Sequence, residues 1–262
     1  MPDTLVTVCV PVYNGEPYLQ ECLESIARQT HGDLIAIIVD NCSTDGTAVT
    51  CAAFDDPRFF YVRNDTNLGA TGNHNRCLDL ARGCYVKLLS ADDVLLPDTL
   101  DRQIKALERH PDAVLATCNC VVTDPQLKPL QETHYLPGRQ SGKAVIARCA
   151  ARIENLIGGP SNTLLRRDAV GDLRFDPKRK WLADLILHCQ VLRRGNYINI
   201  DQPGFLYRRH FATDSEVGCQ PDIRRADESF FVHRYARGPV GFTRLYYRAL
   251  RRWWNTAGAR AA

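Results

Sequence analysis

The chain has 262 residues, of which 45% are hydrophobic and 24% are charged, and it carries a formal net charge of +3. This composition is typical of a soluble globular protein, and the length allows one large domain or one domain with an appendage. The small net charge gives no reason to expect a nucleic-acid partner.

The first 120 residues alternate between short apolar segments and segments whose apolar residues have helical spacing. The apolar segments predict strands over residues 5–12, 34–39, 59–62, 85–89 and 114–122. The other segments predict helices over residues 17–29, 47–54, 72–81 and 97–109. Strands that alternate with helices and are apolar on both faces predict an α/β fold, with a mostly parallel sheet flanked by helices.

The second half of the chain has a less regular pattern. Residues 125–142 are polar and predict a connecting loop. Helices are expected over residues 143–156 and 181–194, and residues 197–209 predict a hairpin-like pair of strands.

Two adjacent carboxylates, Asp92 and Asp93, come directly after the strand predicted over residues 85–89. Such a pair is self-repelling and is usually retained to hold a hard divalent cation. Mg²⁺ and Mn²⁺ prefer oxygen ligands and often share their coordination shell with substrate phosphates. The alternative is a helix N-cap, since Pro97 follows closely, but a cap requires only one acid.

Polar side chains also follow the first two predicted strands. Tyr13 could stack on a base and Asn14 could hydrogen-bond to the base or ribose, unless the segment is only a turn. Asp40 could accept from a ring N–H or a sugar hydroxyl, or it could cap the next helix. Arg76 could pair with a phosphate or with Asp92, although most arginines are solvated.

Three segments within residues 6–100 together resemble the family 2 glycosyltransferases, which have the GT-A fold. They read VTVCVPVYNGEPYLQECLESIARQT, IIVDNCSTDGT and NLGATGNHNRCLDLARGCYVKLLSADDVLLPDTL. The resemblance implies an inverting enzyme that moves a sugar from a nucleotide-diphosphate donor to an acceptor hydroxyl, with Mn²⁺ or Mg²⁺ as cofactor. It also implies a saccharide or lipid-linked acceptor, and a role in surface polysaccharide or glycolipid assembly.

The resemblance carries roles to individual residues. By this carry-over, the nucleotide pocket is lined by Pro11, Val12, Tyr13, Asn14, Glu16, Asp40, Asn75, Arg76 and Asp92. The metal is held by Asp93, Asp92 and His210, and the catalytic base is Asp184. Arg208, Gly159 and Ser161 are expected on the diphosphate or acceptor side.

The chain departs from the family pattern at two positions. Ser90 stands where the family often has an aspartate, and Ala183 stands where another acid usually precedes the catalytic one. A catalytically silent protein that binds sugar nucleotides is therefore an alternative. A nucleotidyltransferase is a second alternative, but such enzymes usually have a glycine-rich loop with a basic residue after the first strand.

These observations predict a GT-A-like catalytic domain over residues 1–220, with a nucleotide-binding half over 1–120 and an acceptor half over 121–220. Residues 221–262 predict a basic, aromatic extension of two helices separated by Gly238-Pro239. This extension suits contact with an anionic membrane surface; the alternatives are a helix packed on the catalytic domain or a dimer contact.

The cysteines and the apolar segments bear on the cellular compartment. The 11 cysteines include no C-x-x-C pair and predict neither a disulfide framework nor a zinc site. No signal peptide and no membrane-spanning segment is recognisable. We therefore expect a cytoplasmic protein, with peripheral contact at the inner face of the membrane left open.

Overall fold

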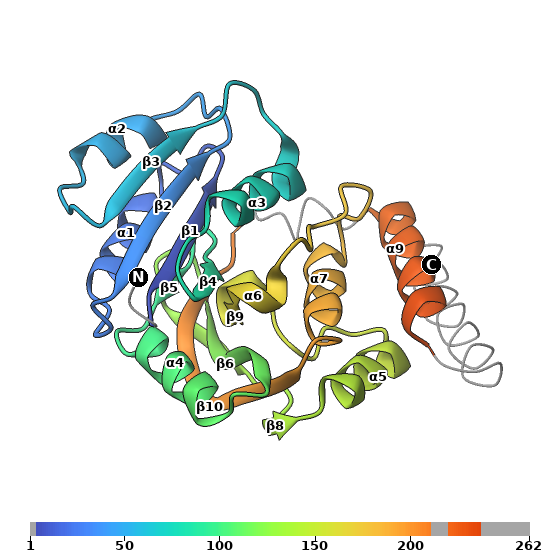
Figure 1. The fold of residues 1–262 in the computed structure, drawn as a ribbon. Coiled ribbons are helices and arrows are strands. Elements are labelled where there is room, and N and C mark those ends of the chain that lie inside the picture. Colours follow the sequence, from blue (N-terminus) through green and yellow to red (C-terminus); the bar gives the residue numbers. More distant parts are fainter. Residues whose placement is uncertain (1–3, 211–219, 237–262) are drawn as a thin grey trace.

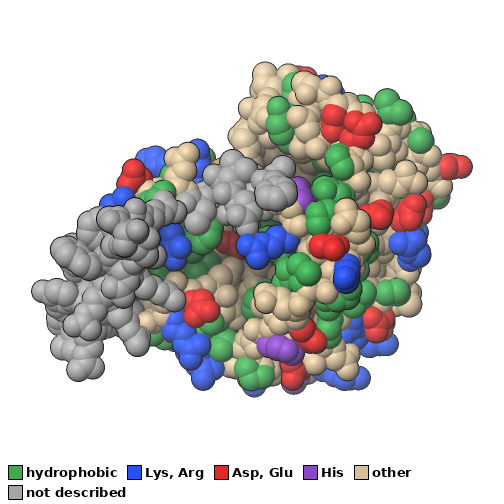
Figure 2. All heavy atoms as spheres, turned by 180° about the vertical axis from the view of Figure 1, so that it is seen from behind, with side chains coloured by type: hydrophobic (Ala, Val, Ile, Leu, Met, Phe, Trp, Pro, Cys, Tyr) green, Lys and Arg blue, Asp and Glu red, His purple; other side chains and the backbone are tan. Residues whose placement is uncertain are grey.

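The computed structural model describes residues 4–210 and 220–236. Within this part of the chain, ten strands form one sheet, and helices cover both of its faces (Figure 1). The α/β fold class is therefore confirmed. In the opposite view of Figure 2, acidic and basic side chains are interspersed over the described surface rather than gathered by sign.

The elements follow the predicted order, with the short β5 added within the first 120 residues and further additions in the second half. The strands are β1 (Val6–Val12), β2 (Leu34–Asp40), β3 (Phe59–Arg63), β4 (Tyr85–Leu88), β5 (Val94–Leu95), β6 (Ala113–Thr123), β7 (Pro129–Thr133), β8 (Gly138–Gln140), β9 (Leu164–Arg166) and β10 (Asn196–Arg208). The helices are α1 (Leu19–Ala27), α2 (Thr47–Ala53), α3 (Gly69–Leu80), α4 (Thr99–Arg109), α5 (Gly142–Arg152), the short η1 (Pro160–Asn162), α6 (Arg167–Val170), α7 (Ala183–Val191) and α9 (Pro221–Tyr235).

The sheet is parallel over β3, β2, β1 and β4 and mixed elsewhere. Its order is β3-β2-β1-β4-β9-β6-β10-β5, with β7 beside β6 and β8 beside β10. The pairs joining β3, β2, β1 and β4 are parallel, as is the pair of β6 and β10. Val12 lies opposite Asp40, so the loops that follow β1 and β2 leave the sheet side by side. β9 is antiparallel to both of its neighbours.

Side chains from alternate positions of the central strands enter two different cores. Val8 and Val10 of β1 pack with α1 and α4 on one face of the sheet, whereas Cys9 packs with residues of α3 and α7 on the other. Because side chains of a strand point alternately to its two faces, a strand covered on both faces is apolar throughout. This explains the continuous apolar runs in the sequence.

Two expectations for the second half are wrong. The predicted loop over 125–142 contains β7 and β8, whose largely exposed residues lack the apolar signal of a buried strand. The predicted hairpin over 197–209 is one strand, β10, in which the turn-like sequence around Pro203 forms an irregularity of the pairing with β6. The second predicted C-terminal helix lies outside the described residues.

No helix within the described residues is long and apolar enough to cross a membrane.

Candidate active site

The loop after β1 and the loop after β2 are joined by hydrogen bonds from backbone amides to side chains. The N–H of Thr44 donates to Oδ1 of Asn14 at 2.8 Å, and the N–H of Gly46 donates to Oε2 of Glu16 at 2.9 Å. In return, the N–H of Asn14 donates to Oγ of Ser43 at 2.9 Å. Asn14 and Glu16 thus hold the second loop in place, and Asn14 adopts a left-handed conformation with φ of 53°.

The other predicted nucleotide-pocket residues of the first strand differ in accessibility. Val12 is buried and Pro11 is half-buried, whereas the side chain of Tyr13 is 52% exposed at the carboxyl end of β1. An exposed aromatic ring beside a fixed polar loop can stack on a base. Of Pro11, Val12 and Tyr13, Tyr13 is therefore the residue most accessible to a ligand.

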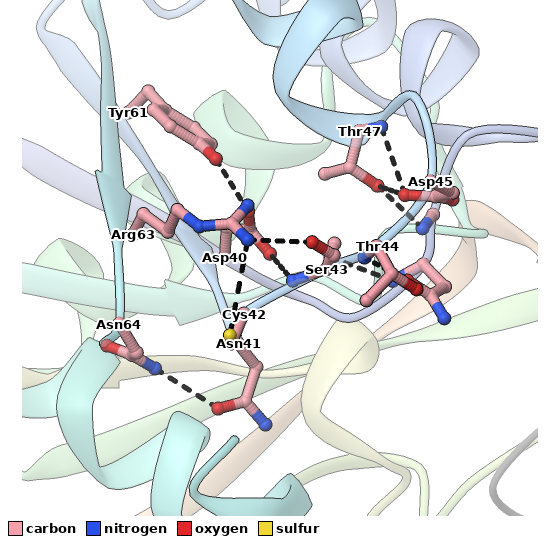
Figure 3. Close-up of polar contacts among 12 residues, drawn as sticks. Asp40, Asn41, Cys42, Ser43, Thr44, Asp45, Thr47, Tyr61, Arg63 and Asn64 are labelled. Atoms are coloured by element: carbon pink, nitrogen blue, oxygen red, sulfur yellow. Dashed lines mark hydrogen bonds and ion pairs between the residues drawn. The ribbon is translucent and has the colours of Figure 1, made fainter. Parts of the chain in front are cut away.

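Asp40 is fully buried at the end of β2, and both of its carboxylate oxygens accept hydrogen bonds (Figure 3). Oδ1 accepts from the N–H of Ser43 at 2.9 Å, while Oδ2 accepts from the Tyr61 hydroxyl at 2.5 Å and from Arg63 at 2.8 Å. Burial alone would raise the pKa of Asp40, but the hydrogen bonds from Ser43 and Tyr61 and the charge of Arg63 outweigh it, so the pKa is lowered. Asp40 is thus a carboxylate with an arginine bound to it.

Asn75 and Arg76 have different surroundings. The side chain of Asn75 makes two hydrogen bonds with the backbone of Phe175, of 2.9 Å to its carbonyl oxygen and 2.7 Å from its N–H. It thereby ties α3 to the segment that leads to α7. Arg76 is exposed, and it makes no ion pair with Asp92 within the part of the chain that the structure describes.

The acidic pair lies beside His210 and Arg208 at the end of β10. Oδ2 of Asp92 is 3.0 Å from Nε2 of His210, and both side chains are partly exposed. Asp93 is only 1% exposed and accepts from the N–H of Arg208 at 3.1 Å. Burial, and then the charge of Asp92, raise the pKa of Asp93 well above its ordinary value. The two acids therefore have unequal access to a ligand.

Arg208 is buried, and its guanidinium is engaged by the protein. It donates to the carbonyl oxygen of Asp92 at 2.9 Å and forms an ion pair with Glu21 of α1. It also lies 4.4 Å over the ring of Tyr18. In this structure, Arg208 fixes the acidic loop against α1.

Asp92 and His210 together offer suitable ligands for a divalent cation that would also be bound by a substrate. Asp92 offers carboxylate oxygen and His210 offers imidazole nitrogen, which are both ligands of Mn²⁺ and Mg²⁺ sites. Among the described residues, no group of three or more His, Cys, Asp or Glu side chains could hold a metal ion. A cation here would therefore need oxygen ligands from outside the protein, as Mg²⁺ commonly takes from phosphates.

Asp184 lies in the first turn of α7, next to a glycine loop. Its Oδ1 accepts from the N–H of Leu185 at 2.7 Å, and its Oδ2 accepts from Nδ2 of Asn155 at 3.0 Å. Burial raises the pKa of Asp184 to about 6 despite these hydrogen bonds. A Cβ atom at Gly159 would lie 3.9 Å from Oδ2, and Gly158 has φ of +104°, so this loop passes close to the carboxylate.

The glycine loop is also joined to the acidic loop. The N–H of Ser90 donates to Oγ of Ser161 at 3.1 Å, and the two hydroxyl groups are 3.3 Å apart. Oδ1 of Asn162 accepts from the N–H of Gly159 at 2.9 Å, which closes the turn of η1. Ser90 stands where the family often has an aspartate. Its contacts with Ser161 join the loop that carries Asp92 to the glycine loop beside Asp184.

Sequence reasoning missed several residues of this region. Tyr61 and Arg63 are two residues apart in β3, so their side chains point to the same face of the sheet. The alternation of side chains along that strand could have predicted that they lie together. Asn155 stands beside Asp184 only because of tertiary packing, and no sequence signal marks it.

Comparison with known proteins identifies the family of the chain. A family model described as "Glycosyl transferase family 2" matches residues 7–174. The putative teichuronic acid biosynthesis glycosyltransferase TuaG of Bacillus subtilis is 37% identical over 193 residues, which are 73% of this chain and 73% of that protein. The chain spans about half or less of the length of three other curated relatives that it matches.

Solved structures share the fold. S. aureus TarS 1–349 in complex with UDP-GlcNAc has a TM-score of 0.74 at 16% identity, over 94% of this chain and 71% of that one. The mannosyltransferase PcManGT from Pyrobaculum calidifontis, in complex with GDP-Man and Mn²⁺, has a TM-score of 0.64 at 23% identity, over 95% of this chain and 71% of that one. Since the family model covers more than half of the sequence, the chain belongs to glycosyl transferase family 2 and has the GT-A fold.

Proposed function

We propose that this protein transfers a sugar from a nucleotide-diphosphate donor to an acceptor hydroxyl, with inversion at the anomeric carbon. The observation that carries the proposal is the connection of Asp184 to the acidic loop. Asp184 has a pKa of about 6 and lies beside Gly159, while the Ser90–Ser161 hydrogen bonds join that loop to the loop of Asp92. A base and a diphosphate site are the two parts that this reaction needs.

The donor nucleotide would bind at the carboxyl ends of β1 and β2. The exposed ring of Tyr13 would stack on the base. The guanidinium of Arg63, whose side chain is 43% exposed and is held by the buried Asp40, would donate to the edge of the base. Asn14 and Glu16 would shape this pocket through the loop that they hold. Asn75 and Arg76 would lie at its border.

Asp184 would act as the general base. It takes the proton of the acceptor hydroxyl while that oxygen bonds to the anomeric carbon, and the bond from this carbon to the diphosphate oxygen breaks on the opposite face. A carboxylate with a pKa of about 6 is largely ionised at neutral pH and is still a competent base. Gly159 and Ser161 would leave room for the acceptor, and Arg208 would keep the acidic loop in position.

A divalent cation, Mn²⁺ or Mg²⁺, would be bound by Asp92 and His210, with the buried Asp93 next to them. When bound, it would neutralise negative charge on the departing diphosphate.

The acceptor is proposed to be a saccharide or a lipid-linked saccharide of a surface polysaccharide or glycolipid. The name of TuaG, which refers to teichuronic acid biosynthesis, supports this class of pathway. The ten described cysteines are free, which suits the reducing cytoplasm. The aromatic side chains Phe231 and Tyr235 of α9 are buried in the domain, so they are not available to a membrane. We therefore propose peripheral membrane contact only for residues 237–262.

The test is turnover of a panel of UDP- and GDP-sugars with and without Mn²⁺, measured as released nucleotide diphosphate. We expect slow donor hydrolysis that requires the cation and is lost in Asp184→Asn. Binding without any turnover would support the catalytically silent alternative. A nucleotidyltransferase would instead release pyrophosphate from a nucleoside triphosphate and a sugar phosphate.

A further inference from the structure

A carboxylate of the C-terminal helix is buried at the start of the helix that carries Asp184. Asp227 of α9 is 1% exposed, and its Oδ2 accepts from three consecutive backbone N–H groups. These are the N–H groups of Lys180 at 2.9 Å, Trp181 at 2.7 Å and Leu182 at 3.1 Å. Successive amides that converge on one oxygen form an anion-binding concavity in the backbone.

This contact replaces the cap that α7 lacks. Leu182 is the N-cap residue of α7 and makes no side-chain cap of its own. A negative charge near a helix N-terminus is favourable, and here it comes from a segment 45 residues further along the chain. Arg179 lies 3.2 Å from Oδ1 of Asp227, so the buried charge is also paired.

Other residues of α9 also contact α7 and the segment before it. Phe231 is fully buried in the core that also contains Leu185 and Ile186 of α7. The Tyr235 hydroxyl donates to the carbonyl oxygen of Ile186 at 3.4 Å, and the guanidinium of Arg179 lies 4.6 Å over the Phe230 ring. Figure 1 shows α9 beside α7, on the side away from the sheet.

We propose that Asp227 is a positioning residue for glycosyl transfer, because it fixes the backbone of residues 180–182 and thereby the placement of Asp184 two residues later. In this view α9 is part of the catalytic unit rather than an appendage. The inference rests on the proposed role of Asp184 as the base. A misplacement of the base by about 1 Å can lower the rate by about a hundredfold.

A purely structural role for Asp227 makes a different prediction. If the contact only stabilises the fold, activity should follow the fraction of folded protein, and any substitution with the same loss in melting temperature should act alike. If Asp227 positions Asp184, kcat should fall in fully folded protein, while the KM for the donor stays unchanged because the nucleotide loops lie elsewhere.

The experiment compares Asp227→Asn with two controls in the full chain. Tyr235→Phe removes a different α9–α7 hydrogen bond, and Ile26→Val destabilises the core on the opposite face of the sheet. The readouts are kcat and donor KM for the fastest substrate among the UDP- and GDP-sugars, together with hydrogen exchange of amides 180–186. The exchange measurement needs no donor.

For Asp227→Asn, we expect a kcat about tenfold lower, a donor KM within about twofold of wild type, and faster exchange at residues 180–186. Both controls should keep the wild-type kcat. If Asp227→Asn does not fold, Arg179→Gln unpairs the same carboxylate and should lower kcat about threefold to tenfold.

Unchanged exchange, or a wild-type kcat in the Asp227→Asn protein, overturns the inference. The inference fails alone if Asp184→Asn is inactive while Asp227→Asn is fully active. The proposed function fails if Asp184→Asn keeps wild-type turnover.

Discussion

The loops that follow β1 and β2, where we propose that the nucleotide binds, and the surroundings of Asp184 are held in different ways. The loops after β1 and β2 interlock through Asn14, Glu16 and their partners, which lie about 30 residues apart in two polar segments. Asp184 instead depends on Asn155, on the glycine loop and on α9. The first region is built by two short motifs, whereas the second is assembled from three distant parts of the chain.

This difference separates donor binding from chemistry. Changes in the interlocked loops should act on donor affinity, since we propose that those loops meet the nucleotide at the carboxyl ends of β1 and β2. Changes around Asp184 should act on kcat, because they alter the group that we propose takes the proton. Substitutions in each region therefore test whether donor binding and chemistry are separate.

The largest effect is expected from Asp184→Asn. The amide keeps the size of the side chain but cannot accept the proton, so kcat should fall by about 10²–10⁴-fold. Donor affinity, measured by calorimetry with UDP or GDP and Mn²⁺, should be unchanged. The control is Asp168→Asn, which removes an exposed acid of α6 and should leave both quantities at wild-type values. Equal loss of donor affinity and kcat in Asp184→Asn would contradict the separation of the two regions.

The next effect is expected from Asp92→Asn at the border of the two regions. Loss of the charge beside His210 should weaken metal-assisted stabilisation of the diphosphate and lower kcat/KM by about a hundredfold at low Mn²⁺. Part of the activity should return as the Mn²⁺ concentration is raised. The control is Asp101→Asn, since Asp101 pairs with Lys105 on the surface of α4. An Mn²⁺ dependence identical to that of wild type would exclude Asp92 as a ligand.

The difference between local motifs and distant contacts also explains which parts of the fold could be predicted from the sequence. Apart from the two-residue β5, the strands and helices of the first 120 residues were predictable. Both faces of β1, β2 and β4 are buried, which leaves continuous apolar runs. β7 was not predictable, since its exposed residues carry no such pattern. The irregularity at Pro203 resembles a turn in sequence, and only the pairing of β10 with β6 shows that the strand continues.

The candidate site was predictable where a motif lies within one segment. Asp92 and Asp93 follow a buried strand, and the structure brings His210 to Asp92. Asp184 was found by resemblance, but its neighbours Asn155 and Asp227 were not, because the contacts that place them join segments 29 and 45 residues apart. Those contacts depend on tertiary packing, which local patterns do not encode.

A smaller effect is expected from pH. Because burial raises the pKa of Asp184 to about 6, kcat should fall about tenfold for each pH unit below that value. Stability should change in the opposite sense: the folded protein binds this proton more tightly than the unfolded chain, so Asp184 costs folding free energy as the pH rises from about 4 to 6. Asp184→Asn should abolish this contribution to the pH dependence of unfolding, measured by urea titration. An acidic limb centred near pH 4 would contradict a raised pKa at the catalytic base.

The smallest effect is expected from the interlocked loops. Asn14→Gly keeps the left-handed backbone but removes the 2.8 Å acceptor for the N–H of Thr44. One such hydrogen bond is worth about 1 kcal/mol, so the Kd for UDP or GDP should rise about fivefold, with kcat at saturating donor unchanged. Asn14→Asp retains the acceptor oxygen and serves as the control, with a Kd close to wild type. If Asn14→Gly lowered kcat and left Kd unchanged, the loops after β1 and β2 would belong to the chemistry, and the two regions would not be separable.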